Sequence, residues 1–279
     1  MQLEMTSFIQ KIVNNNPLIN CLTNMVTVNF QANALLAIGA SPIMTDEPDA
    51  APQVSSQAQA VVINIGSPFG PNKIEAIKSS LVQANQAGVP VVIDPVGIAA
   101  LDNRLTFVKE LLTTYKIEAV VGNYSEIAAL AGVKSSGKGV DGGQPEEAID
   151  SLVTRVANTF HTIVVATGKT DVMGDGERII SHSYGHKMMG SVTGTGCVAT
   201  TMVAAFISQA QNSQEALEAA SLATAYYAWC GGKAVERCQG PGDLPVHLLN
   251  YLYTYSVEAN NHDTSEIDTL TIQEKGAKA

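Results

Sequence analysis

Residues 61–65 read Val-Val-Ile-Asn-Ile, and residues 89–94 read Val-Pro-Val-Val-Ile-Asp. Both runs are almost entirely apolar, as is typical of strands buried on both faces of a parallel sheet. Between them, Asn72–Ala87 carries apolar residues at the spacing of a helix, and Gly88 follows as a stop signal. A strand, a helix and a second strand in this order predict an α/β fold built on a parallel sheet.

The same alternation extends in both directions along the chain. The predicted strands are Leu18–Cys21, Val61–Ile65, Val89–Ile93, Ala119–Val121 and Thr162–Ala166. Within Thr170–Ser181, a Gly-Asp-Gly turn separates two apolar pairs, which predicts a hairpin and hence an antiparallel edge. After Gly196 the pattern becomes helical, over Cys197–Gln209, Gln214–Arg237 and about Leu244–Ala259.

The domain organisation follows from what separates these elements. Neither a Pro/Gly/Ser linker nor an internal repeat divides the sequence, so we expect a single domain over residues 1–259. It should have three layers, with helices on both faces of a mostly parallel central sheet and a helical C-terminal part. Residues 260–279 are polar and are predicted to form a flexible tail.

Composition excludes several classes of protein. Of 279 residues, 46% are hydrophobic and 15% are charged, which is too apolar for a disordered chain. No apolar run approaches the roughly 18 residues needed to span a bilayer. The net charge of −10 would repel nucleic acid, and the N-terminus lacks the pattern of a signal peptide, so we expect a cytoplasmic protein. The cysteines are widely spaced and are predicted to be reduced: Cys21, Cys197, Cys230 and Cys238.

We expect catalytic and binding residues just after the predicted strands, because ligands of parallel sheets bind beyond the carboxyl ends of the strands. Four such places stand out: 20–24, 94–97, 122–126 and 167–168. Asp94 ends an otherwise apolar strand, where a carboxylate is costly unless a polar or cationic partner meets it. Magnesium with a phosphate is one such partner, and the capping of a turn or helix is the alternative.

The most informative segment is Val192-Thr193-Gly194-Thr195-Gly196-Cys197, which leads directly into a helical stretch. Two glycines let the backbone approach a ligand closely, while the helix directs its positive end at the same point. The segment therefore predicts a phosphate cradle, with tight packing of a glycine-rich loop as the alternative. It lies too late in the chain for a dinucleotide fingerprint, and Gly168-Lys169-Thr170 lacks the first glycine of a P-loop.

Cys197 falls in the first turn of this predicted helix. The helix dipole is expected to lower the pKa of its thiol and to favour a catalytic role beside the phosphate. The alternative is that Cys197 is a small buried side chain with a packing role.

Five motifs in one order carry a family resemblance: Cys21-Leu22-Thr23-Asn24, Gly39–Met44, Asp94-Pro95-Val96-Gly97, Gly122–Ile127 and Val192–Cys197. With them the chain resembles the hydroxyethylthiazole kinases of thiamine salvage, which belong to the ribokinase-like superfamily. The resemblance runs from Asn16 to about Tyr253. It implies ATP-dependent phosphorylation of the primary alcohol of 4-methyl-5-(2-hydroxyethyl)thiazole, a requirement for Mg²⁺, and a homotrimer with active sites at the subunit interfaces.

The resemblance also implies roles for individual residues. Cys197 would be catalytic, and the substrate would lie against Met44, Asn24, Gly66 and Gly194. Asp94 and Glu126 would hold magnesium, directly or through water. The ATP site would be formed at Thr167, Val121, Asn123 and Gly196.

One departure from the family pattern affects function. Val121 stands where the family usually has an arginine, so a bidentate phosphate contact is missing. This loss supports one alternative, a relic that binds thiazole with little turnover, and two others stay open: a kinase for hydroxymethylpyrimidine or pyridoxal, and a nicotinamide-nucleotide hydrate dehydratase. Cys197 counts against the dehydratase, which usually has aspartate at that position.

Overall fold

The computed structural model describes residues 5–67, 69–133, 147–259 and 265–276. Its strands are β1 (Leu18–Leu22), β2 (Ser41–Met44), β3 (Ala60–Asn64), β4 (Val91–Asp94), β5 (Ala119–Asn123), β6 (Ile163–Thr167), β7 (Asp171–Gly174), β8 (Arg178–His182) and β9 (Gln273–Gly276). They form one sheet in the order β2-β1-β3-β4-β5-β6-β7-β8-β9. Neighbours from β2 to β6 are parallel, and the pairs from β6 to β9 are antiparallel. The mostly parallel central sheet is thus confirmed.

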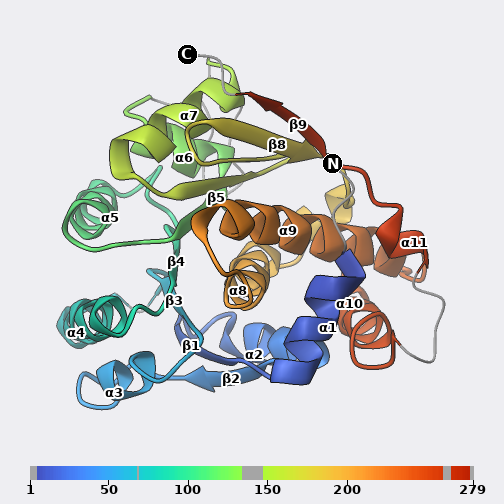
Figure 1. Ribbon diagram of the computed structural model, residues 1–279, viewed down its shortest axis with the longest axis horizontal. Coiled ribbons are helices and arrows are strands. Elements are labelled where there is room, and N and C mark those ends of the chain that lie inside the picture. Colours follow the sequence, from blue (N-terminus) through green and yellow to red (C-terminus); the bar gives the residue numbers. More distant parts are fainter. Residues whose placement is uncertain (1–4, 68, 134–146, 260–264, 277–279) are drawn as a thin grey trace.

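Helices cover both faces of this sheet (Figure 1). Those of the first face are α1 (Met5–Asn15), α2 (Val28–Ala37), α8 (Thr195–Ile207), α9 (Ser213–Val235) and α10 (Leu244–Thr254). The other face carries α3 (Ala51–Ser55), α4 (Pro71–Ala87), α5 (Asp102–Thr114), α6 (Tyr124–Leu130) and α7 (Ile149–Phe160). Side chains alternate along the strands, so each face has its own apolar core. The described helices are not long and apolar enough to cross a membrane.

Every predicted strand is present, with its ends shifted by two residues at most. The predicted hairpin is formed by β7 and β8 around residues 175–177. Strand β2 was not predicted, because Pro42 interrupts its short pattern. A proline is tolerated there because β2 lies at the edge of the sheet, where one row of backbone groups has no strand partner.

The C-terminal residues differ from the predicted flexible tail. Their described part forms α11 (Ser265–Asp268) and β9, and β9 pairs with β8. Ile267 and Ile272 are buried, and Asp268 accepts hydrogen bonds from Thr6 on α1. These two isoleucines and the partly buried Leu270 supply apolar contacts that hold a mostly polar segment against the domain.

The topology identifies where a ligand should bind. From β1 the chain passes to β2 on one side and then to β3 on the other, so the winding direction of the sheet changes at β1. In open parallel sheets such a change leaves a crevice beyond the carboxyl ends of the strands. Helix α8 packs across β3 and β4 on this part of the sheet.

Candidate active site

Three neighbouring strand ends supply the polar side chains of the site. Asn24 follows β1, Asn64 ends β3, and Asp94 ends β4. Asn64 and Asp94 are register partners in the parallel pair β3–β4. All three side chains are buried, at 5%, 1% and 5% relative exposure. Polar groups so fully buried must find hydrogen-bond partners in one another.

The carboxamide of Asn64 is the centre of this network. Its Nδ2 donates to Asp94 Oδ2 at 2.6 Å and to Cys197 Sγ at 3.2 Å. Its Oδ1 accepts from Asn24 Nδ2 at 3.0 Å and from the Gly66 backbone N–H at 2.9 Å. The structure thus brings four predicted site residues together around one side chain.

The glycine-rich segment forms the N-terminus of α8. Gly194 caps the helix with φ 97° and ψ −7°, a conformation that strongly favours glycine. In the described part of the chain, no hydrogen bond runs from the N–H of Gly194, Thr195, Gly196 or Cys197 to a loop or side-chain acceptor. The first N–H groups of a helix lack partners within the helix, so they are free to bind an anion here.

Neighbouring elements fix the position of this cradle. Tyr227 on α9 donates through its hydroxyl to the Thr195 carbonyl at 2.9 Å, and Thr195 Oγ1 donates to the Met189 carbonyl at 2.9 Å. Thr27 packs directly against Gly194, where a Cβ atom would lie only 2.8 Å from the Thr27 methyl group. The cradle is therefore packed on one side and open on the other.

The expectation of an acidic Cys197 thiol is wrong. Burial and the nearby Asp94 carboxyl raise the pKa of Cys197 well above its ordinary value. A helix N-terminus favours a thiolate by only about 0.3–2 kcal/mol, which is too little to offset an adjacent buried carboxyl group. This environment favours the thiol over the thiolate, and the sulfur of Cys197 lies at hydrogen-bond distance of Asn64 and Asn24 and hydrogen-bonds Asp94.

Glu126 is tied to the backbone on both sides. Its Oε1 accepts from the Gly97 N–H and its Oε2 from the Asn123 N–H, each at 2.9 Å. The Asn123 side chain in turn accepts from the Glu126 N–H, which completes a capping box at the start of α6. The turn after β4 and the end of β5 are thereby held together by one carboxylate.

Asp94 and Glu126 form a buried acidic pair. Burial and the Glu126 charge raise the pKa of Asp94, and burial raises that of Glu126. Two carboxylates that are buried close together repel each other, and a cation bound between them would offset this repulsion. No group of three or more His, Cys, Asp and Glu side chains that could hold a metal occurs within the described ranges. Two carboxylates still fit Mg²⁺, which usually keeps waters and binds substrate phosphates as well.

The predicted nucleotide residues lie one strand further on. Thr167 ends β6 beside Asn123 of β5, and its hydroxyl donates to the Gly122 carbonyl at 3.3 Å. Val121 is 2% exposed and packs in the apolar core beneath α8. Its side chain faces away from solvent and offers no polar group to a phosphate.

Met44 and Gly66, the other predicted substrate contacts, lie at the end of β2 and just after β3. Met44 ends β2 beside Cys21 of β1 and is half-buried. At Gly66 a Cβ atom would lie 2.8 Å from Asn24 Cβ and 2.9 Å from Asn64 Oδ1, so only glycine fits this turn.

Sequence reasoning missed two residues of the site, Asn64 and Lys73. Asn64 ends an apolar strand just as Asp94 does, and that shared position was a usable signal. Lys73 is 7% exposed, and its Nζ donates to the Thr23 carbonyl at 2.6 Å and to the Gly66 carbonyl at 3.4 Å. Burial lowers the pKa of Lys73 to about 8, although Asp46 opposes the shift. The hydrogen bonds of Lys73 to the Thr23 and Gly66 carbonyls form only when the chain folds.

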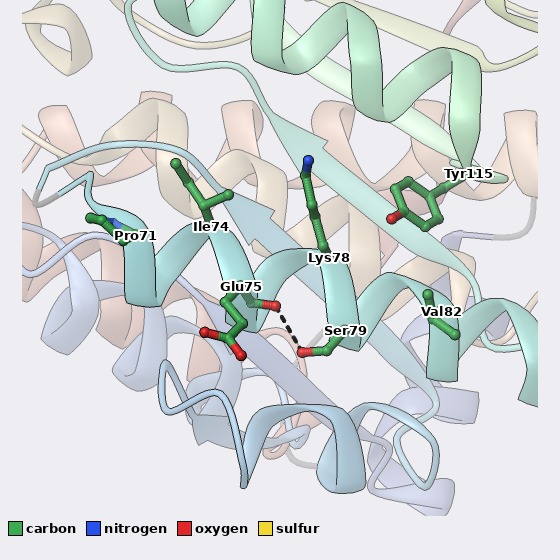
Figure 2. Close-up of a pocket in the computed structure, with 7 residues that line it drawn as sticks. All are labelled: Pro71, Ile74, Glu75, Lys78, Ser79, Val82 and Tyr115. Atoms are coloured by element: carbon green, nitrogen blue, oxygen red, sulfur yellow. Dashed lines mark hydrogen bonds between the residues drawn. The ribbon is translucent and has the colours of Figure 1, made fainter.

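A separate groove lies on the outer side of α4 (Figure 2). It has a volume of about 660 Å³ and is lined mainly by apolar atoms of Pro71, Ile74, Glu75, Lys78, Ser79, Val82 and Tyr115. Figure 2 shows Lys78 extending from α4 toward α5, where it pairs with Glu110. None of its lining residues belongs to the predicted site.

Comparison with known proteins gives the family and the fold. The model of the hydroxyethylthiazole kinase family matches residues 9–258. A hydroxyethylthiazole kinase from Exiguobacterium is 37% identical over 252 residues, which cover 89% of this chain and 94% of that protein. The solved structure of a hydroxyethylthiazole kinase from Pyrococcus horikoshii superposes with a TM-score of 0.84 at 32% identity, over 97% of this chain and 98% of that one. A ribokinase-like protein from Enterococcus faecalis, 13% identical with a TM-score of 0.60 over 90% of this chain and 95% of that one, shares the fold. The predicted ribokinase-like fold is confirmed.

Proposed function

The chain belongs to the hydroxyethylthiazole kinase family, and on that premise we propose that it transfers the γ-phosphoryl group of ATP to the primary alcohol of 4-methyl-5-(2-hydroxyethyl)thiazole. The observation that carries this proposal is the grouping of Asp94, Asn64 and Cys197 beside the open N-terminus of α8. Such a grouping puts an anion site next to polar side chains that can orient an alcohol. Because the reaction consumes ATP, we propose the cytoplasm as its compartment.

The thiazole lies between β1, β2 and β3 in this proposal. Met44 supplies an apolar and polarisable contact to the ring, and Asn24 and Gly66 border it from the loops after β1 and β3. Gly194 lines the passage between substrate and phosphate. Its closeness to Thr27 supports this role, since a side chain would narrow the passage.

ATP binds along the ends of β5 and β6, with Thr167 and Asn123 facing the nucleotide and the N–H of Gly196 facing its phosphates. Val121 leaves the family's usual arginine contact unmade. Asp94 and Glu126 would hold Mg²⁺, which when bound supplies positive charge against the phosphate oxygens. The buried and mutually repelling carboxyl groups support this assignment.

The chemistry then depends mainly on position and charge. The alcohol oxygen forms a bond to the γ-phosphorus as the bond to the β–γ bridging oxygen breaks, ADP leaves with that oxygen, and the hydroxyl proton passes late to an oxygen of the transferred phosphoryl group. The N–H groups at the start of α8 stabilise the charge on the equatorial oxygens. A loose transfer of this kind makes little demand on a base, so a neutral thiol at Cys197 suffices to orient the hydroxyl.

We propose a homotrimer with its sites at the subunit interfaces. Met25 and Val26, which directly follow Asn24, are each 71% exposed. Leu36 on α2 and Val246 on α10 are 55% and 60% exposed, and these two helices pack together. Exposed apolar side chains on adjoining elements are typical of a surface that a subunit covers.

A coupled assay tests the function directly. Purified protein with ATP and Mg²⁺ is given the thiazole alcohol, hydroxymethylpyrimidine or pyridoxal, each alone. Turnover of the thiazole alcohol is expected. Transfer only to the pyrimidine or pyridine would refute the proposal, and thiazole binding without turnover would favour a relic. Light scattering with and without Val26→Asp tests the trimer, which that variant should dissociate.

A further inference from the structure

Asn64 occupies a position in this site that none of the predicted roles explains. It lies between two groups of residues that must act together. On one side are Asn24 and Gly66, which border the proposed thiazole site, and on the other are Asp94 and Cys197. Figure 1 shows β3, which ends at Asn64, between β1 and β4 in the middle of the parallel part of the sheet.

The hydrogen bonds of the Asn64 carboxamide are fully used. An amide has two donor hydrogens and two acceptor lone pairs. Both donors are directed at the phosphoryl-transfer side, to Asp94 Oδ2 at 2.6 Å and Cys197 Sγ at 3.2 Å. Both acceptor positions are directed at the substrate side, to Asn24 Nδ2 at 3.0 Å and the Gly66 N–H at 2.9 Å.

The orientation of the amide is fixed by its partners. Rotation of the amide by half a turn would put the Asn64 oxygen against the Asp94 carboxylate and its NH₂ group against the Gly66 N–H. Like groups would then face each other at hydrogen-bond distance in a site that is 1% exposed at Asn64. Aspartate and leucine cannot reproduce the pattern, because aspartate lacks the NH₂ group and leucine lacks donors and acceptors, and glutamine is one methylene too long to place its amide at the same point.

We propose that Asn64 is a positioning residue that sets the substrate loops and the phosphoryl-transfer groups at a fixed distance from each other. The proposal rests on the proposed kinase function. Its consequence is that the two halves of the Asn64 amide have separable effects. The acceptor half holds Gly66 and Asn24 and governs thiazole binding, whereas the donor half holds Asp94 and Cys197 and governs turnover.

Asn64→Asp separates the two halves. Aspartate has the same shape and retains the acceptor for Asn24 and Gly66, but its ionised form has no donor for Asp94 or Cys197 and adds a like charge, and its protonated form has one donor in place of two. We expect kcat for the thiazole alcohol to fall about 10- to 100-fold or more, which corresponds to loss of one charged hydrogen bond. The dissociation constant for thiazole, measured by calorimetry without nucleotide or metal, should stay within about threefold, since its contacts are kept.

Asn85→Asp is the matched control. Asn85 makes the same kind of double contact, donating to the Lys116 carbonyl and accepting from the Lys116 N–H, at the far end of α4. It loses a donor in the same way but should leave kcat and thiazole binding unchanged. Thermal unfolding of both variants reports whether the fold is kept.

Several outcomes decide the matter. Equal changes in kcat and thiazole binding for Asn64→Asp, or no change in kcat, would overturn the proposal. If Asn64→Asp does not fold, Asn64→Ser replaces it, and this shorter side chain should weaken both binding and turnover. A serine variant that leaves both unchanged would also overturn it. Wild-type turnover tests the kinase function separately, because the inference depends only on ratios between variant and wild type.

Discussion

Replacement of Gly194 by alanine tests the anion cradle most directly. Gly194 has φ 97°, and a Cβ atom there would lie 2.8 Å from Cγ2 and 3.1 Å from Cβ of Thr27. The backbone conformation costs a non-glycine residue about 1–2 kcal/mol, and overpacking adds about 1–3 kcal/mol. The melting temperature of Gly194→Ala should therefore fall by about 4–20 °C at roughly 2–4 °C per kcal/mol.

The kcat of Gly194→Ala should fall by more than the loss of folded protein accounts for. Relief of the clash should move the start of α8 away from Thr27, and with it the N–H groups that would face the phosphate in the proposed site. Loss of one such donor typically reduces kcat by about 100- to 1,000-fold. A coupled kinase assay at saturating ATP and thiazole measures this effect.

Two further variants separate the causes. Thr27→Ser removes the methyl group that the added Cβ atom of Gly194→Ala would meet but keeps the hydroxyl that accepts from Gln31. Combined with Gly194→Ala, it should restore the part of the stability lost to the clash and leave the part lost to φ. Gly190→Ala is the control, because a Cβ atom there meets nothing within 4 Å. Wild-type melting and kcat in Gly194→Ala, or no recovery in the double variant, would refute the reasoning.

Three more predictions follow from the same structure. Cys197→Ser should lower kcat about tenfold while the thiazole dissociation constant changes less, because the thiol orients the alcohol; steady-state kinetics with calorimetry measures both, and unchanged turnover would remove its catalytic role. Glu126→Gln should raise the Mg²⁺ concentration for half-maximal rate and lower stability by about 1–3 kcal/mol, because its amide would face a backbone N–H; an unaltered metal dependence in a Mg²⁺ titration would exclude this ligand. Burial raises the pKa of Asp171 from 3.8 to about 7 and lowers that of His182 from 6.5 to about 4. Between these values folding adds one proton at Asp171 and removes one at His182, so the free energy of unfolding measured in urea should be nearly independent of pH. The free energy of unfolding of Asp171→Asn should fall as pH drops from 6.5 toward 4, and that of His182→Gln should fall as pH rises from 4 toward 7, each by up to ~1.4 kcal/mol per pH unit. If the stability of both variants changed with pH in the same direction, the assignment would be contradicted.

The strand pattern predicted most of the fold because buried parallel strands leave an unambiguous apolar run. The sequence pattern did not predict strand β2, because this strand is short and carries Pro42, which only an edge position tolerates. The packed C-terminal segment was not predicted because its few apolar residues, Ile267, Leu270 and Ile272, contact parts of the domain that are far away in sequence. Local periodicity does not report contacts of that kind.

The site residues at strand ends were predictable for the same reason, since parallel strands bring their carboxyl ends together. Asp94 was predicted as a site residue because a carboxylate at the end of an apolar run needs a polar or cationic partner, whereas the neutral amide of Asn64 gives a weaker signal. Lys73 could not be predicted, because its partners are backbone carbonyls after two other strands. A sequence gives no record of which carbonyls a lysine will meet.

The error over Cys197 has a more general cause. The helix N-terminus favours a thiolate, and the sequence displays it, but the effect is modest and declines within one turn. Burial and the Asp94 carboxyl act in the opposite direction and are stronger, and both exist only after β4 and α8 come together. Because Cys197 keeps its proton, the thiol can donate to Asp94 while its sulfur accepts from Asn64. In the proposed reaction the alcohol would meet a site ordered by neutral donors and acceptors, so we expect the rate to come from alignment with the phosphate rather than from a reactive sulfur.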